Sequence, residues 1–158
     1  MVDFKPGRGI EKSVFLQAPD TKVIEGTAKS MKPANATYTV LVIEDEKMVM
    51  DVSRKMLERL EYHVLQARNG SEANSIVRTY NGDIDLAILD VNLPDIMGGA
   101  LYPVIIKERP NMKVIVSSGY DLEGPAREIL DAGAKGFIKK PYSLHALSEK
   151  LNEILCTG

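Results

Sequence analysis

Side chains that can do chemistry stand where short apolar runs of this sequence end. They are three carboxylates, a hydroxyl and an amine: Glu44, Asp45, Asp90, Ser118 and Lys140. Acids gathered at one place repel one another, and a pair about 4 Å apart costs roughly 4 kcal/mol at an effective dielectric near 20. Carboxylate oxygens with a nearby backbone carbonyl suit Mg²⁺, which retains waters and binds phosphate oxygens. The amine and hydroxyl are suited to holding a phosphoryl group. The pattern predicts Mg²⁺-dependent phosphoryl chemistry if the fold brings these residues together.

Alternating strands and helices must position these side chains. Short β-branched or apolar runs predict strands at 39–43, 62–67, 85–89, 113–117 and 136–139. Apolar residues at helical spacing, with turn residues between, predict helices at 47–60, 71–80, 98–110, 121–133 and 143–155. Ser71 and Ser143 are expected to open two of these helices and Gly133 to cap another, while Pro103 falls within the first turns of its helix.

This βα alternation predicts an α/β fold with a parallel sheet covered by helices on both faces. The strands read as apolar throughout, which is expected when both faces of a sheet are buried. The carboxyl ends of parallel strands meet at one edge of the sheet, where ligands bind. Each site residue also has a plain structural reading. For example, Glu44, Asp45 and Glu46 could simply favour the start of the following helix.

Four motifs in order resemble the receiver domain of two-component response regulators. An acidic pair, Glu44-Asp45, follows the first strand, and "LDVNLPDIMGG" around Asp90 follows the third. Ser118-Gly119 ends the fourth strand and Lys140-Pro141 the fifth. The resemblance covers about residues 38–155. It implies a flavodoxin-like, doubly wound (βα)5 three-layer sandwich with strand order 2-1-3-4-5.

The resemblance also implies a role for each residue. Asp90 would be the phosphoacceptor that takes a phosphoryl group from a phosphohistidine. The Mg²⁺ ligands would be Asp45, Asp90 and the main-chain carbonyl of Asn92, with Glu44 acting mostly through metal-bound water. Lys140 would pair with Asp90 and then with the phosphoryl oxygens, and the spacing to proline favours it over Lys139. Ser118 and Phe137 would form the switch, although Phe137 could equally be a plain core residue.

Three residues are expected to shape the backbone around the site. Pro94 stiffens the loop that offers the carbonyl of Asn92, and Gly98 lets the chain turn tightly into the next helix. The resemblance suggests a cis bond before Pro141, whereas X-Pro bonds are usually trans. Asn92 and Tyr120 flank the site and would tune the lifetime of the phosphoryl group. The first acid is Glu44 rather than the commoner Asp, which lengthens the reach and keeps the charge.

The 158 residues are 44% hydrophobic and 27% charged, with a formal net charge of −2. This balance is that of a globular domain and argues against direct nucleic-acid binding. A single cysteine, Cys156, excludes a disulfide within the chain, and neither a membrane-spanning run nor a signal-peptide core is present. We therefore expect a cytoplasmic setting with no membrane segment in this chain, and the resemblance to receiver domains implies that the setting is bacterial. Residues 1–37, rich in turn residues, are expected to be an extension or linker before a receiver domain at 38–156.

Two architectures fit the sequence. Residues 7–23 resemble the end of a histidine-kinase ATPase domain, which favours the C-terminal receiver of a hybrid histidine kinase. A free-standing single-domain regulator is the alternative. In either case the expected partner is the phosphohistidine domain of a kinase or a histidine phosphotransfer protein, and a phosphorylation-dependent dimer stays open. The receiver would catalyse its own phosphorylation without being a conventional enzyme, although a parent chain could be a histidine kinase.

Two other classes of protein use related features. A haloacid-dehalogenase-type phosphatase also has a strand-end Asp nucleophile, but it needs a second Asp two residues later, where this chain has Asn92. A flavin-binding flavodoxin-like protein needs a phosphate-cradling loop after the first strand. The Glu44-Asp45-Glu46 loop would repel a phosphate unless a metal intervened.

Overall fold

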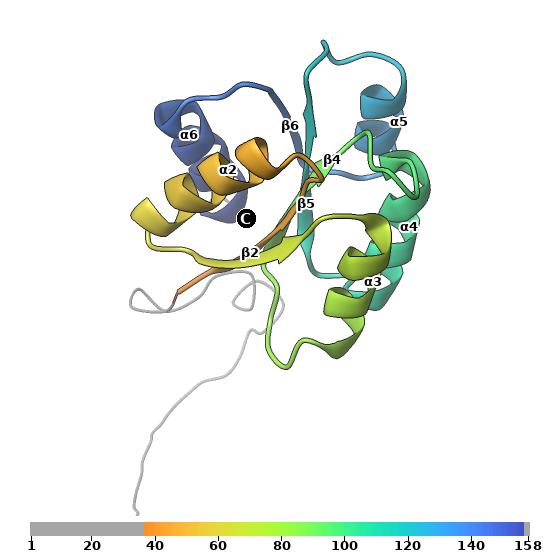
Figure 1. Cartoon of the computed structure of the whole chain (residues 1–158), viewed down its shortest axis with the longest axis horizontal. Coiled ribbons are helices and arrows are strands. Elements are labelled where there is room, and N and C mark those ends of the chain that lie inside the picture. Colours follow the sequence, from red (N-terminus) through yellow and green to blue (C-terminus); the bar gives the residue numbers. More distant parts are fainter. Residues whose placement is uncertain (1–36, 157–158) are drawn as a thin grey trace, which may run out of the picture. The chain divides into compact units, whose positions relative to one another are not determined.

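In the computed structural model, residues 37–156 are described, and they form a five-stranded parallel sheet with five helices (Figure 1). Nearly all of the extension predicted at residues 1–37 lies outside this range. The strand order, β3-β2-β4-β5-β6, is the predicted order 2-1-3-4-5. The elements are β2 (Thr39–Ile43), α2 (Lys47–Arg59), β3 (His63–Ala67), α3 (Gly70–Thr79), β4 (Leu86–Asp90), α4 (Gly98–Glu108), β5 (Lys113–Ser118), α5 (Pro125–Asp131), β6 (Gly136–Lys139) and α6 (Leu144–Leu155).

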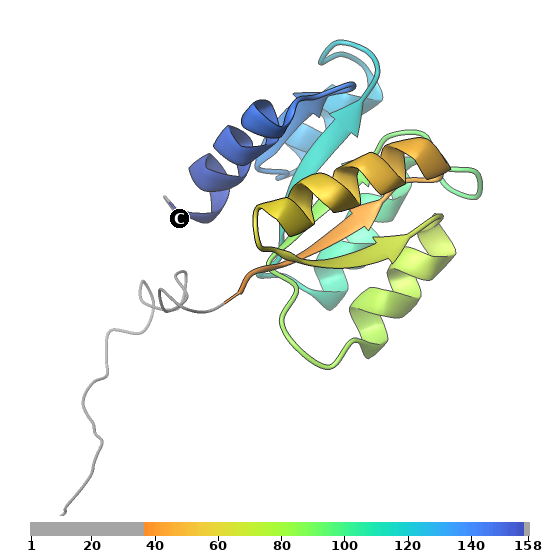
Figure 2. The same ribbon diagram turned by 60° about the vertical axis from the view of Figure 1, so that its left-hand side comes forward.

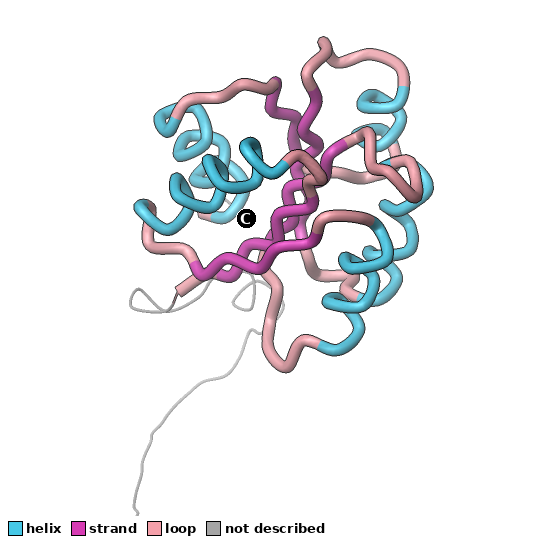
Figure 3. The backbone as a smooth tube through the Cα atoms, viewed as in Figure 1, coloured by secondary structure: helices cyan, strands magenta, loops and turns pink. Residues whose placement is uncertain are grey.

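Helices cover both faces of the sheet, as the turned view in Figure 2 and the tube in Figure 3 show. Helices α2 and α6 pack on one face and α3, α4 and α5 on the other. Alternate residues of β2 enter the two cores: Val40 and Val42 lie in one, Leu41 and Ile43 in the other. The predicted α/β three-layer architecture is therefore confirmed.

The second strand differs from its prediction. We expected apolar strands buried on both faces, which holds for β2 and β4. Strand β3 lies at the edge of the sheet, and its His63 and Gln66 are exposed. An edge strand has a neighbour on one side only, so solvent reaches part of it.

The helix ends correct one prediction and confirm two. Asn69, not Ser71, caps α3, and its side chain accepts a hydrogen bond from the Glu72 N–H at 2.7 Å. Ser71 already lies in the first turn of the helix. Ser143 caps α6 by accepting from the Ala146 N–H at 3.0 Å. Gly133 follows α5 with φ 131°, a backbone conformation that glycine adopts without strain.

Pro103 lies inside α4, as the sixth residue of the helix. This position is one turn deeper than those where proline costs nothing, because its missing N–H would have bonded to a carbonyl of the preceding turn. The ring points to solvent and the helix continues to Glu108.

Arg109 ties the end of α4 to the loop after α3. Its guanidinium donates to three backbone carbonyls, those of Val77, Gly82 and Tyr80, at 2.6–2.7 Å. A planar guanidinium offers several donors in a fixed fork, so it can satisfy carbonyls left open at the end of a helix. The contact braces the end of the sheet opposite to the candidate site. Among the described helices, none is both long and apolar enough to cross a membrane.

Candidate functional site

The predicted site residues meet at the carboxyl edge of the sheet. Asp90 ends β4 and Ser118 ends β5, while Glu44 and Lys140 follow β2 and β6 directly. The sheet order places β2 and β4 side by side, although β3 lies between them in sequence. This is the point where successive strands are added in opposite directions, and clefts form there in doubly wound sheets.

Three carboxylates form a cluster that could hold a metal ion. One oxygen from each of Glu44, Asp45 and Asp90 lies within 4.8 Å of the others. Glu44 and Asp90 are both 4% exposed, whereas Asp45 is exposed. Hard carboxylate oxygens at this spacing are the donor set that Mg²⁺ uses, with waters completing its shell. The residues present therefore fit Mg²⁺.

The acids Glu44, Asp45 and Glu46 could have served only to stabilise the start of α2. Glu46 is the N-cap residue of α2, but its side chain makes no capping hydrogen bond, and the first turn of α2 contains no acid. Glu44 instead accepts the Glu46 N–H at 3.2 Å and turns its other oxygen to Lys140. The buried acid thus points into the cluster rather than along the helix.

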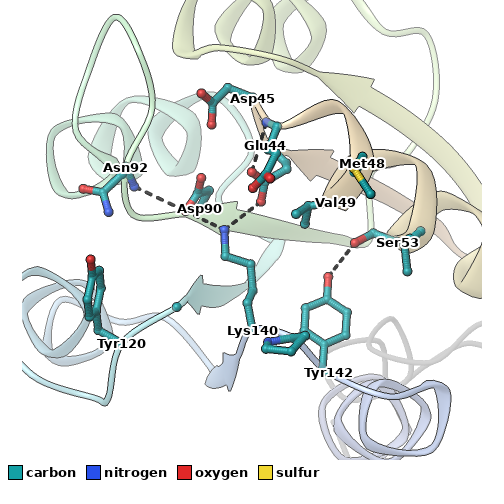
Figure 4. A pocket seen from close by; sticks show the side chains of 14 residues that line it. Glu44, Asp45, Met48, Val49, Ser53, Asp90, Asn92, Tyr120, Lys140 and Tyr142 are labelled. Carbon is teal, nitrogen blue, oxygen red and sulfur yellow. Dashed lines mark hydrogen bonds and ion pairs between the residues drawn. The ribbon is translucent and has the colours of Figure 1, made fainter.

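Lys140 supplies the positive charge in this cluster. Its Nζ lies 3.0 Å from Glu44 Oε1 and 3.3 Å from Asp90 Oδ1 (Figure 4). Lys139 points elsewhere and pairs with the exposed Asp121 at 2.8 Å. The geometry therefore brings Lys140, and not its neighbour, to the acids.

Burial and mutual repulsion set the protonation behaviour of the cluster. Burial, with a contribution from the Asp45 charge, raises the pKa of Asp90 above its ordinary value despite Lys140. Burial and the Asp90 charge likewise raise the pKa of Glu44. Burial alone would lower the pKa of Lys140, but the hydrogen bond to Glu44 and the charges of Asp90 and Glu44 outweigh it, so the pKa rises. Lys140 stays charged, and the acids lack full compensation.

The loop after β4 is closely packed against Asp90. The Gly98 N–H donates to the Val91 carbonyl at 2.8 Å, and Asn92 bridges to Met97, so the loop closes on itself. A Cβ at Gly98 would lie 2.8 Å from the Asp90 carbonyl oxygen, which explains the glycine. The Asn92 N–H donates to Asp90 Oδ1 at 3.3 Å. Pro94 lies exposed in this loop.

Two predicted switch residues lie on the face covered by α3, α4 and α5. Ser118 is 5% exposed, and its hydroxyl accepts the Tyr120 N–H at 3.0 Å. Phe137 pairs with Val116, two residues before Ser118, and its half-buried ring packs against the same core. Both are thus placed together, on the face opposite to α2. The Lys140–Pro141 bond is cis, which resolves the alternative that the sequence left open.

A pocket of about 670 Å³ opens over the cluster. Its apolar wall comes from α2 and from the segment after β6, and it includes Met48, Val49, Val52, Pro141 and Tyr142. The Tyr142 hydroxyl and the buried Ser53 hydroxyl lie 2.7 Å apart, joining α2 to the segment that carries Lys140. Sequence reasoning missed this pair because 89 residues separate its members and neither type signals the other.

The protein-family model of the response regulator receiver domain matches residues 40–152 of this chain. This range contains every residue of the candidate site. The chain belongs to the response regulator receiver domain family. The predicted family and fold class are therefore confirmed.

Two similar proteins illustrate the range of the family. The sensor kinase CckA of Brucella abortus is 34% identical over 97% of this chain, but the chain spans only 17% of that kinase. A CheY-like receiver domain protein from Methanospirillum hungatei is 31% identical, with a TM-score of 0.71 over 77% of this chain and 96% of that structure. The matched region is therefore a small part of the long kinase, but it makes up nearly all of the solved chain.

A second solved structure bears on the fold. The receiver domain of the sensor histidine kinase PA1611 from Pseudomonas aeruginosa has a TM-score of 0.69 at 23% identity, over 77% of this chain and 99% of that domain. It was solved with a magnesium ion coordinated in its active-site cleft. In this chain, the three carboxylates described above form an acidic cluster that could hold a metal ion.

Proposed function

We propose that this receiver domain accepts a phosphoryl group on Asp90 with Mg²⁺ bound at the acidic cluster. The observation that carries this proposal is the buried Asp90 carboxylate at a strand end, within reach of one lysine and two further acids. A strand end fixes the carboxylate in direction, which favours in-line attack. Asp90 Oδ1 accepts hydrogen bonds from the Asn92 N–H and from Lys140 Nζ, whereas no donor among the described residues reaches Oδ2, so Oδ2 is available.

The chemical step is a transfer from nitrogen to oxygen. A carboxylate oxygen of Asp90 attacks the phosphorus of a phosphohistidine, the P–N bond breaks, and the imidazole leaves with its electron pair and takes up a proton. The product is an acyl phosphate on Asp90. When bound, Mg²⁺ would neutralise charge on the acids and the phosphoryl oxygens. Asp45, Asp90 and the Asn92 carbonyl would hold it, with Glu44 acting through water.

Lys140 and Ser118 act on the phosphoryl group after transfer. Lys140 exchanges one carboxylate partner for a phosphoryl oxygen, since its amine has three donors. Ser118 gives up the Tyr120 N–H and donates its hydroxyl to a phosphoryl oxygen. The movement of Ser118 vacates space on the face where Phe137 lies, and the ring turns inward. The resulting change in surface over α5, β6 and α6 is the output.

The similarity to CckA suggests in what kind of longer protein this receiver domain occurs. We propose that this chain is the C-terminal receiver of a hybrid histidine kinase in the bacterial cytoplasm, because its likeness to that kinase extends over 97% of the chain rather than the receiver alone. Its partner is then a phosphohistidine domain or a histidine phosphotransfer protein. The boundary between residues 1–37 and a domain at 38–156 belongs to the same proposal.

Intact-mass measurement tests the acceptor chemistry. The protein is incubated with acetyl phosphate and Mg²⁺, beside an EDTA control and the Asp90→Asn variant. We expect an alkali-labile gain of one phosphate in the wild type only. A phosphate retained by Asp90→Asn would refute the assignment of the acceptor.

A further inference from the structure

The loop between β4 and α4 is attached to a second helix by Asp95. Both carboxylate oxygens of Asp95 accept backbone N–H groups from the start of α3: Gly70 at 2.8 Å and Ser71 at 2.9 Å. The residues are 24 and 25 positions apart in sequence, so this is a tertiary contact between two neighbouring helix–loop segments. Two hydrogen bonds from helix N-terminal amides to one carboxylate are charge-assisted and fix its direction.

The contact of Asp95 is not needed to cap α3. Helix α3 already has a cap of its own, because the Asn69 side chain accepts the Glu72 N–H at 2.7 Å. Asp95 reaches the two preceding N–H groups from outside the helix. These amides hold the pKa of the Asp95 carboxyl below its ordinary value, so it is ionised at neutral pH.

Packing around the contact leaves it little freedom. Ile96, the next residue of the loop, lies so close to Gly70 that a Cβ there would overlap its side chain. On the other side of the loop, Leu93 is 8% exposed and belongs to the core under α3 and α4. The loop is therefore held at two points, by Leu93 in the core and by Asp95 on α3.

The held loop is the one that presents the Asn92 carbonyl. Within it, the Gly98 N–H bonds to the Val91 carbonyl and Asn92 bridges to Met97, so residues 91–98 move as one unit. A displacement at Asp95 is consequently transmitted to Asn92, three residues away. Main-chain carbonyl ligands cannot adjust by rotating a side chain, so their position depends on the loop that carries them.

We propose that Asp95 is a positioning residue for the metal site, which anchors the Asn92 carbonyl to the N-terminus of α3. The inference rests on the proposed function, because it assumes that Asn92 faces bound Mg²⁺. Groups that orient metal ligands typically change metal affinity 10–100-fold when removed. Since Asn92 would supply one ligand of several, we expect Asp95→Ala to weaken Mg²⁺ binding about tenfold.

Asn69→Ala is a matched control. It removes a hydrogen bond from the same helix start as Asp95→Ala, but the Asn69 side chain bonds to Glu72 within α3 and not to the loop at 91–98. If Asp95 acted only by stabilising α3, the two variants would change Mg²⁺ affinity equally. Asp95→Asn keeps one acceptor oxygen and loses the charge, so it should fall between wild type and Asp95→Ala.

The test is an Mg²⁺ titration of the unphosphorylated full chain, carried out for wild type and the three variants. Backbone amide NMR monitors each titration. We expect wild-type affinity in Asn69→Ala, a roughly tenfold loss in Asp95→Ala, and shifts of the Asn92 and Leu93 amides in metal-free Asp95→Ala. Equal affinities for wild type and Asp95→Ala, with both folded, would overturn the inference and leave the proposed function intact. A wild type that binds no Mg²⁺ at all would overturn the proposed metal site instead.

Discussion

Lys140 makes its shorter contact with Glu44, at 3.0 Å, and its longer one with Asp90, at 3.3 Å. Sequence reasoning expected Asp90 as the main partner of this lysine and expected Glu44 to act mostly through metal-bound water. In the structure, Glu44 and Asp90 share the lysine. Binding of Mg²⁺ and of a phosphoryl group would therefore redistribute Lys140 from Glu44 toward the phosphoryl oxygens.

Lys140 and its neighbour offer a matched pair of substitutions. Lys140→Ala should slow phosphorylation by acetyl phosphate by about two orders of magnitude, because a fixed charge near the transferring phosphoryl group is lost. Lys139→Ala should leave the rate nearly unchanged, since Lys139 pairs with the exposed Asp121. The rates are measured by intact mass at a fixed Mg²⁺ concentration. Equal slowing in both variants would contradict the placement of Lys140.

The two glycines that begin α4 should respond in opposite directions to alanine. In Gly98→Ala the new Cβ would meet the Asp90 carbonyl oxygen at 2.8 Å and the Val91 Cα at 3.1 Å, so backbone must shift. We expect a loss of about 1–3 kcal/mol in the free energy of unfolding. In Gly99→Ala the nearest atom is 4.0 Å away, and the helix should gain about 0.5 kcal/mol. Urea unfolding of both variants checks the difference in sign.

Removing the acceptor carboxylate should stabilise the metal-free protein at neutral pH. Burial raises the pKa of Asp90 and Glu44, so the folded state resists their ionisation, and stability falls as pH rises through these raised values. Asp90→Asn removes one of three repelling charges. The free energy of unfolding should rise by about 1 kcal/mol. The rise is small because Asp90→Asn removes the attraction to Lys140 together with the repulsion between the acids.

This gain should depend on pH and metal. It should disappear as pH falls below the ordinary carboxyl range, where Asp90 is neutral in both folded and unfolded states. Added Mg²⁺ should also reduce it, because the wild type alone keeps the full acidic cluster. Unfolding curves in EDTA at several pH values provide the measurement. A variant less stable than wild type at neutral pH would show that Lys140 compensates the acids fully.

Arg109 should be a determinant of stability without a role in phosphorylation. Its guanidinium satisfies three carbonyls at once, so Arg109→Ala should cost about 2–3 kcal/mol, the range for losing hydrogen bonds to a charged group. Arg109→Lys should recover little of this, since an ammonium cannot reproduce the planar fork. Thermal unfolding and acetyl phosphate labelling of both variants separate stability from chemistry.

The pattern of apolar runs was enough to predict a parallel sheet covered by helices, whereas the strand order, which places β2 beside β4, came from the resemblance to receiver domains. Within a strand, side-chain direction alternates with period two, so Glu44 follows Val42 and Asp90 follows Ile88 on one face of the sheet. That Val42 and Ile88 share a face is visible only in the structure. Contacts between distant segments were not predictable in this way. The cap of α3 was assigned to Ser71 because Asn69 and Ser71 are both good caps and only the backbone conformation decides between them. The links Asp95–Gly70 and Ser53–Tyr142 likewise depend on how helices pack.

The most direct test of the central claim is to locate the phosphoryl group on the chain. Wild-type protein phosphorylated with acetyl phosphate and Mg²⁺ is reduced with borohydride, which converts an acyl phosphate to the corresponding alcohol, and is then mapped by peptide mass spectrometry. The account predicts a single homoserine at position 90, which is absent when EDTA is present. Modification at another acid, such as Asp45 or Glu44, with Asp90 unchanged would contradict it.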